Sequence, residues 1–328
     1  METEKNLAES AETEVAIESV ENVETASSGD PVSLTYRERK KRFGDRSDGR
    51  KLRTIHPMNR IMPYIMPKRS DALNTFYDTI NVEAAEALCR RKAREGMTNI
   101  TILHVLLAAY LRTIAARPGI NRFISGQKVY ARKGIVFVMT IKKEMSLEAP
   151  DTVIKVEFEP TDTLDDVYRK FNDTATSALK ALEEPTGIDS LMGTLNKLPG
   201  FVLRFFVWLL NKLDYHGHLP KSLLDVSPFH GSMIITSMGS LGINPIYHHI
   251  YDFGNLPVFL SYGTKRTVYE VGKNGEIIRK RLIDLKAVTD ERVCDGYYFA
   301  SAFKLFKKLV ERPGSLNEPL KELKEDVD

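Results

Sequence analysis

Cysteine and tryptophan are scarce in this sequence, which has two cysteines and one tryptophan among 328 residues. The cysteines, Cys89 and Cys294, are spaced neither as metal ligands nor as a disulfide pair. We therefore expect two buried, unreactive thiols and a reducing, cytoplasmic compartment. A signal peptide is not expected either, because residues 1–30 are rich in glutamate and contain no apolar segment.

A long hydrophobic run is also missing. The most apolar segment, residues 198–210, contains Arg204 and is shorter than the ~20 residues that span a bilayer. No membrane span is predicted, and a helix in the core or at an interface is the favoured interpretation. The alternative is a helix lying in a membrane surface, with Lys197, Arg204 and Lys212 at its rim.

Clusters of metal-ligating residues are absent as well. His216 and His218 stand two residues apart, but no third ligand has a suitable spacing, so no metal is expected. His104 falls on the apolar face of a predicted helix and is interpreted as a packed core histidine.

Charge is unevenly distributed, although the net charge is only +3. Residues 1–30 are acidic, whereas residues 37–53 are dense in arginine and lysine. Blocks of like charge are typical of solvated chain, so residues 1–48 are predicted to be a disordered arm. The basic block can contact nucleic acid or an acidic partner. Loose pairing between the two halves of the arm is favoured instead, and no nucleic-acid partner is expected.

The remaining sequence alternates between patterns typical of strands and of helices. Pro57, Pro63 and Pro67 predict an extended, packed segment over residues 51–68. After Pro313 the chain is polar and predicted to fray. The predicted strands are 75–82, 134–142, 152–159, 232–237 and 258–262, and the predicted helices are 83–95, 98–116 with Thr98 or Asn99 as its cap, and 163–182 capped by Thr163.

The last predicted strands form a hairpin, residues 266–270 and 276–288, through Lys273-Asn274-Gly275. The second strand leads to Asp290-Glu291-Arg292-Val293-Cys294-Asp295-Gly296, and an amphipathic run follows over residues 299–310. A junction between a strand and a helix is suited to holding a reactive side chain next to a helix N-terminus.

This junction resembles the signature of the chloramphenicol acetyltransferase-like superfamily, which includes the catalytic domain of the dihydrolipoyl acyltransferases of 2-oxo acid dehydrogenase complexes. In that family the run reads Asp-His-Arg-x-x-Asp-Gly or His-His-x-x-x-Asp-Gly, and the histidine before Arg-x-x-Asp-Gly is the general base. This sequence has Glu291 at that position. The resemblance assigns Asp295 a supporting role in the site, with Arg69 or Arg60 as its ion-pair partner.

A second landmark lies within residues 227–263, where a strand passes into Gly239-Ser240-Leu241-Gly242. It is similar to the family element in which a strand ends in Ser-Asn-Leu-Gly and whose serine donates a hydrogen bond to the oxyanion. Thr236 occupies that serine's position, and Ser237 and Ser240 are candidate contacts for coenzyme A.

Together the two landmarks extend the resemblance over residues 55–312. It implies a two-layer α/β sandwich with a mixed β-sheet, formed by residues 49–312 between the arm (1–48) and a polar tail (313–328). It also implies a homotrimer or higher assembly with active sites between subunits, and an acyl group transferred from a coenzyme A or lipoyl thioester.

Three interpretations of the missing histidine remain open. Glu291 is itself the base, if burial raises its pKa. The base has instead moved to His248 or His249, which follow the presumed oxyanion strand. In the third interpretation the chain is a pseudoenzyme, a non-catalytic binding or assembly protein that keeps the fold.

Overall fold

Strands rich in valine, isoleucine and phenylalanine form the centre of the structure, a computed structural model that describes residues 39–142, 151–181 and 198–328. Within these residues a six-stranded sheet has the order β2-β9-β8-β7-β5-β6, and a three-stranded sheet has the order β1-β4-β3. The strands are β1 (Gly49–Lys51), β2 (Leu73–Asn81), β3 (Arg122–Ser125), β4 (Lys128–Arg132), β5 (Ile135–Lys142), β6 (Asp151–Phe158), β7 (Met233–Ser237), β8 (Val258–Val271) and β9 (Ile277–Asp290).

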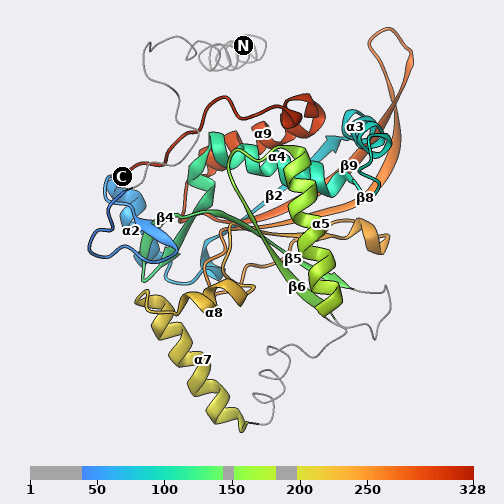
Figure 1. Ribbon diagram of the computed structural model, residues 1–328. Coiled ribbons are helices and arrows are strands. Elements are labelled where there is room, and N and C mark those ends of the chain that lie inside the picture. Colours follow the sequence, from blue (N-terminus) through green and yellow to red (C-terminus); the bar gives the residue numbers. More distant parts are fainter. Residues whose placement is uncertain (1–38, 143–150, 182–197) are drawn as a thin grey trace, which may run out of the picture. The chain divides into compact units, whose positions relative to one another are not determined.

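The larger sheet is mixed, because β7 runs parallel to both β5 and β8 while the other pairs are antiparallel. Helices α3, α4, α5 and α9 cover one of its faces (Figure 1) and share the main hydrophobic core with it. The helices are α2 (Pro57–Ile65), α3 (Glu83–Arg94), α4 (Ile102–Ala116), α5 (Leu164–Ala181), α7 (Gly200–Tyr215), α8 (Lys221–Val226) and α9 (Gly296–Glu311). This arrangement confirms the predicted two-layer α/β sandwich.

A second, smaller core lies on the opposite face of the sheet. Val138, Ile234 and Phe259 point to this face and pack with Ile250 and Leu256, which come from the segment before β8. Side chains alternate between the faces of a strand, so residues two apart in β5, β7 or β8 share a face. This alternation determines which candidate residues share a face of the sheet.

One predicted extended segment and one predicted helix start are wrong. Residues 57–65, predicted to be extended, form α2, because Pro57 occupies the first turn, where no backbone N–H is needed, and the His56 side chain accepts a hydrogen bond from the Met58 N–H. Helix α4 begins after Thr101 and not after Thr98 or Asn99. The imidazole of His104 accepts a hydrogen bond from the Thr101 N–H at 3.0 Å, which closes a capping box.

Residues 39–48 and 313–328, predicted to be part of the arm and a fraying tail, both pack on the domain. The Arg39 guanidinium lies 2.9 Å from the Asp328 carboxylate, and Arg46, 4% exposed, lies 2.7 Å from Asp214. Leu316 in the tail is completely buried. Carboxylates of the tail thus neutralise arginines of the basic block, a pairing that composition alone does not reveal. Residues 1–38 lie outside the described residues.

Candidate functional site

Strand β7 carries Thr236 to a place where the sheet opens. Strands β5 and β7 pair only at Phe137–Met233 and Val138–Ile234, although β5 continues to Lys142 and β7 to Ser237. Beyond this pairing no strand of the described residues lies between the facing edges of the two strands. A ligand in an extended form could add to the sheet at such an edge.

Thr236 and His248 lie on the same face of the sheet. Thr236 follows Ile234 by two residues and is paired with Ser261 of β8, so its side chain points to the face of the smaller core. The His248 ring stacks on Phe259 of that face, with ring centroids 4.4 Å apart and planes 7° from parallel. Two candidates from separate parts of the sequence are therefore brought together.

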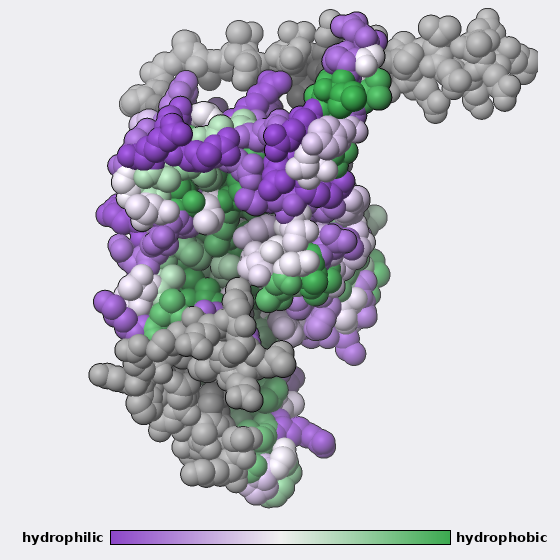
Figure 2. All heavy atoms as spheres, turned by 90° about the vertical axis from the view of Figure 1, so that its right-hand side faces the viewer, coloured by the Kyte–Doolittle hydropathy of each residue, from purple (hydrophilic) through white to green (hydrophobic). Residues whose placement is uncertain are grey.

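A groove of about 1290 Å³ connects these side chains, and Thr236, Ser237, Ser240 and His248 all line it. Its walls are largely apolar, and Figure 2 shows hydrophobic side chains in a hollow of the molecule below a strongly hydrophilic region. The apolar lining residues include Cys89, Ile100, Ile102, Leu103, Met139, Ile141, Phe229, Ile235 and Tyr262.

The charged residues that line the groove are mostly cations. Arg90, Lys142, Lys265 and Arg281 line it, and Glu86 is the lining carboxylate among the described residues. The Glu86 carboxylate lies 2.8 Å from the Lys265 ammonium. An apolar groove with a surplus of positive charge at its edge suits a long ligand with an anionic end. These cations come from four elements, α3, β5, β8 and β9, so no local sequence pattern indicates that they share one groove.

The electrostatic environment keeps His248 neutral. Burial lowers the pKa of His248 below its usual value of 6.5, and the neighbouring His249 lowers it further. A neutral imidazole is the form that accepts a proton. His249 is exposed and packs edge to face against Tyr251, with ring centroids 5.2 Å apart. It does not line the groove.

Ser237 and Ser240 form the turn at the end of β7. The Ser240 hydroxyl donates to the Ser237 carbonyl at 2.7 Å, and Gly242 ends the turn with a φ of +75°. Gly239 packs so closely on β8 that an added Cβ would lie 2.5 Å from the Gly263 carbonyl oxygen. The predicted Gly-Ser-Leu-Gly turn is confirmed, and it fixes one wall of the groove.

Glu291 lies elsewhere. Its carboxylate accepts a hydrogen bond from the Asn74 amide at 2.8 Å, and Asn74 is paired with Thr289 of β9. Thr236 is aligned across β8 with Lys286, five residues before Glu291, so the two candidates lie roughly 20 Å apart. They also lie on opposite faces of the sheet. One chain therefore brings together Thr236 and His248, but not Thr236 and Glu291.

Asp295 is the N-cap of α9 and accepts a hydrogen bond from the Tyr298 N–H at 2.8 Å. The predicted ion pair between Arg69 and Asp295 is wrong, because Arg69 binds Asp290 instead, at 3.2 Å. Arg60 is exposed, and within the described part of the chain it makes no ion pair.

Asp290 is the centre of a buried charge cluster that the sequence did not suggest. Its carboxylate, 1% exposed, accepts hydrogen bonds from Arg69 and from Arg292, whose guanidinium lies 2.7 Å away. Arg69 also donates to the carbonyl oxygens of Tyr251 and Gly254. The cluster thus holds the loop that follows His248 against the end of β9.

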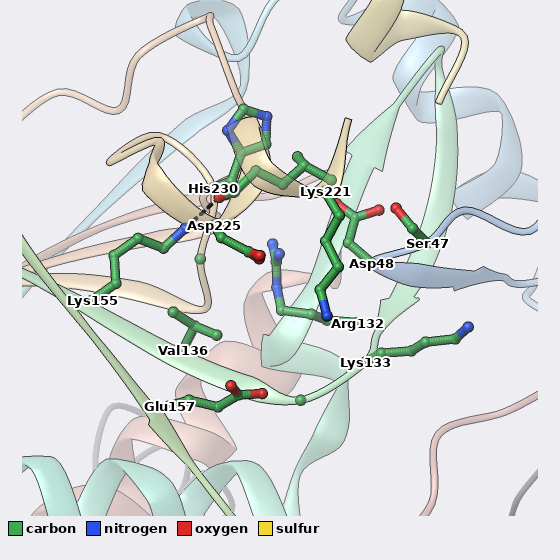
Figure 3. A pocket seen from close by; sticks show the side chains of 13 residues that line it. Ser47, Asp48, Arg132, Lys133, Val136, Lys155, Glu157, Lys221, Asp225 and His230 are labelled. Atoms are coloured by element: carbon green, nitrogen blue, oxygen red, sulfur yellow. Dashed lines mark hydrogen bonds between the residues drawn. The ribbon is translucent and has the colours of Figure 1, made fainter. Parts of the chain in front are cut away.

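A second, more polar cavity of about 430 Å³ lies at the other end of β5 and β6 (Figure 3). Lys155 reaches from β6 to α8, where its ammonium donates to the carbonyl oxygens of Leu224 at 2.6 Å and Ser227 at 3.0 Å. Burial lowers the pKa of Lys155 to about 8. Cations and carboxylates alternate around the cavity, which suits the attachment of α8 to the sheet better than the binding of one charged ligand. The charged residues that line this cavity include the cations Arg132, Lys133 and Lys221 and the carboxylates Asp48, Glu157 and Asp225.

Two other sequence interpretations can be compared with the structure. Cys89 and Cys294 are both free and buried, as predicted. His104 is 2% exposed between the rings of Tyr168 and Phe171, which confirms a packed core histidine. No group of three metal-ligating side chains occurs among the residues that the structure describes.

Comparison with known proteins identifies the fold. Neither the models of protein families nor the curated proteins contain a match to this chain. Among solved structures it is similar to a probable dihydrolipoamide acetyltransferase from Listeria monocytogenes, with 13% identity and a TM-score of 0.50 over 84% of this chain and 99% of that one.

Two further solved structures are similar at lower scores. A truncated catalytic core of the 2-oxoacid dehydrogenase multienzyme complex from Thermoplasma acidophilum has 15% identity and a TM-score of 0.48, over 81% of this chain and 100% of that one. Chloramphenicol acetyltransferase has 12% identity and a TM-score of 0.45, over 80% and 98%. At such identities a likeness shows the fold alone, and this chain has the predicted chloramphenicol acetyltransferase-like fold of the Listeria protein.

Proposed function

We propose that this chain binds a coenzyme A thioester in the groove and transfers its acyl group, with Thr236 as the oxyanion donor and His248 as the general base. The observation that carries the proposal is that one apolar groove with basic residues at its edge is lined by both side chains. The fold supports the same class of chemistry only by analogy.

The groove is suited to both ends of such a thioester. A pantetheine arm is long and largely apolar, and its two amide groups can bind open strand edges as a peptide does. The facing edges of β5 and β7 beyond the Val138–Ile234 pair offer such groups. The phosphates of coenzyme A require cations, and Arg90, Lys265 and Arg281 together carry more positive charge than the neighbouring Glu86 neutralises. A neutral lipoyl thioester would gain nothing from these charges, so coenzyme A is the favoured carrier.

The proposed reaction needs one proton acceptor and one hydrogen-bond donor. His248 is neutral because burial lowers its pKa. It removes a proton from the acyl acceptor, the molecule that receives the acyl group, as this molecule attacks the thioester carbonyl. The Thr236 hydroxyl donates to the oxygen that becomes negative. Collapse of the intermediate expels the coenzyme A thiolate, which takes the proton back from His248.

Glu291 enters this proposal only through a second copy of the chain, because its own Thr236 is on the opposite face of the sheet. The homotrimer predicted from the sequence remains a prediction, which the mass of the protein in solution tests. Because His248 and Thr236 line the same groove of one chain, catalysis by this chain is favoured over the pseudoenzyme interpretation.

The first experiment measures binding and turnover separately. Calorimetry with acetyl-CoA and with acetyl-pantetheine should show tighter binding of the former. Arg90→Gln with Lys265→Gln should remove that preference. Release of free thiol from acetyl-CoA is then followed with hydroxyl, amine and dihydrolipoyl acceptors. If acetyl-CoA does not bind, the proposal is refuted.

Variants assign the roles. Thr236→Val should lower kcat by about 100-fold to 1,000-fold and Thr236→Ser should restore it, because only the hydroxyl is needed. His248→Asn should lower kcat by about 100-fold to 10,000-fold, whereas His249→Asn is the matched control and should have little effect. Binding of acetyl-CoA without turnover of any acceptor would leave a non-catalytic thioester-binding protein.

A further inference from the structure

Helix α7 exposes a cluster of large aromatic side chains. Phe201 is 75% exposed, Phe205 55% and Trp208 53%, and Phe205 stacks on Trp208 with ring centroids 5.8 Å apart. These three residues are spaced by four and three positions, so they form one stripe along the helix. Water-exposed aromatic stripes of this size mark a binding surface.

The helix is apolar around most of its circumference. At 100° per residue the apolar side chains are spread over an arc of about 280°, which also contains Lys212 and Asp214, and Gly200, Arg204 and Asn211 occupy the remainder. In a partner interface that covers only one face of a helix, the remaining apolar surface would stay in water. Apolar surface this wide is covered better by the mobile acyl chains at the boundary of a bilayer, which adapt to its shape, than by one face of a rigid partner.

The exposed charges of α7 itself have one sign. They are those of Arg204 and Lys212, and the exposed Lys221 and Asp225 of α8, which follow in the chain, offset each other. The one carboxylate of α7, Asp214, is 7% exposed and bound by the buried Arg46 at 2.7 Å. The surface is therefore complementary to an anionic partner. A second copy would present the same cations, which repel.

We propose that α7 binds the surface of a bilayer that contains anionic lipids, with Phe201, Phe205 and Trp208 inserted and Arg204 and Lys212 at the headgroups. The helix lies in the plane of the surface. With 16 residues it is about 24 Å long, shorter than the ~30 Å hydrocarbon core. No helix among the described residues is long and apolar enough to cross a membrane.

The C-terminal end of α7 is fastened to the domain, so that lipid binding also docks the domain. Arg46 and Ser125 both bind the Asp214 carbonyl oxygen, and the Tyr215 hydroxyl donates to Gln127 at 3.0 Å. The N-terminal end extends away from the sheet (Figure 1). This inference is independent of the proposed acyl transfer.

Trp208, the one tryptophan of the chain, reports insertion directly. The full-length protein is titrated with phosphatidylcholine vesicles that either contain or lack phosphatidylglycerol. We expect a blue shift of its emission and quenching by brominated lipid chains with the anionic vesicles, both weakened by salt. No shift with anionic vesicles overturns the proposal.

Two variants separate the apolar and the charged contributions, and both keep Trp208. Phe201→Glu with Phe205→Glu should weaken vesicle binding by at least about tenfold. Arg204→Gln with Lys212→Gln should remove the preference for anionic lipid. Tyr269→Glu, at an aromatic residue that is 68% exposed on the β8–β9 hairpin, is the matched control and should bind as the parent does.

Other occupants give distinct results. If α7 binds a second copy, the tryptophan emission is already blue without lipid and changes on dilution together with the mass of the protein. If it binds a protein groove, the emission responds to neither vesicle. Either result refutes the assignment to a bilayer. Circular dichroism of each variant establishes that a loss of binding is not a loss of fold.

Discussion

Replacement of Asp290 by asparagine tests whether the buried charge cluster holds the site together. The Asp290 carboxylate accepts four hydrogen bonds, two from each of its oxygens, at 2.7 to 3.2 Å from Arg69 and from the side chain and backbone of Arg292. Both arginines are 4% exposed. Asparagine keeps the shape of the side chain but removes the charge that compensates two buried guanidinium groups.

The expected loss is large because the cations cannot reach water. Burial already lowers the pKa of Arg69, and the charge of Asp290 opposes that effect. Removing one partner of a buried ion pair costs about 3–5 kcal/mol. We expect Asp290→Asn to lower the free energy of unfolding, measured by urea denaturation and circular dichroism, by an amount in this range.

A matched control distinguishes burial from charge. Glu270 is on the same hairpin and lies 2.5 Å from Lys280, but the two side chains are 46% and 35% exposed. An exposed ion pair contributes about 0–1 kcal/mol, so Glu270→Gln should cost less than about 1 kcal/mol. Equal losses for the two variants would refute the view that Asp290 is the stabilising centre.

Two further predictions concern buried groups. Burial raises the pKa of both thiols, that of Cys89 to about 11. Native protein should therefore react slowly with a thiol reagent, whereas both cysteines should react in urea-unfolded protein. Fast reaction of the native protein would contradict this prediction. Burial lowers the pKa of His104 from 6.5 to about 4. The neutral imidazole therefore contributes fully to stability above pH 6.5, and the free energy of unfolding should fall by about 3 kcal/mol as the pH falls toward 4. His104→Gln keeps an acceptor for the Thr101 N–H but does not titrate, and its unfolding free energy should fall less over that range.

The sequence predicted the elements whose signals are local. The hairpin of β8 and β9 was predicted from its Asn-Gly turn, and the α5 cap from Thr163 at the start of a polar first turn, where its hydroxyl accepts the Asp166 N–H. Helix α2 was missed because its prolines were interpreted as breakers, whereas Pro57 fits the first turn and Pro63 is accommodated inside the helix. In each case the deciding interaction involves residues within a few positions.

The groove depends on relations that are not local. Arg90, Lys142 and Lys265 come from three elements, α3, β5 and β8, and line one groove. The Arg69–Asp290 pair joins residues that are 221 positions apart. The resemblance selected Thr236 and Glu291 as one pair, yet within one chain the register of β7, β8 and β9 separates them. Register over three strands cannot be read from the residues of one motif.

That separation makes the location of the base testable by mixing variants. If His248 is the base, inactive Thr236→Val and His248→Asn proteins each lack a residue of the same groove, and mixing them under conditions of subunit exchange should restore no activity. If Glu291 of a neighbouring copy is the base, Thr236→Val mixed with Glu291→Gln should regain about a quarter of the parental activity, because a quarter of random interfaces pair two intact residues. The measurement is thiol release after exchange, with each unmixed variant as the baseline.

Recovery in the second mixture, Thr236→Val with Glu291→Gln, would transfer the role of base from His248 to Glu291. It would also show that the active site lies between subunits.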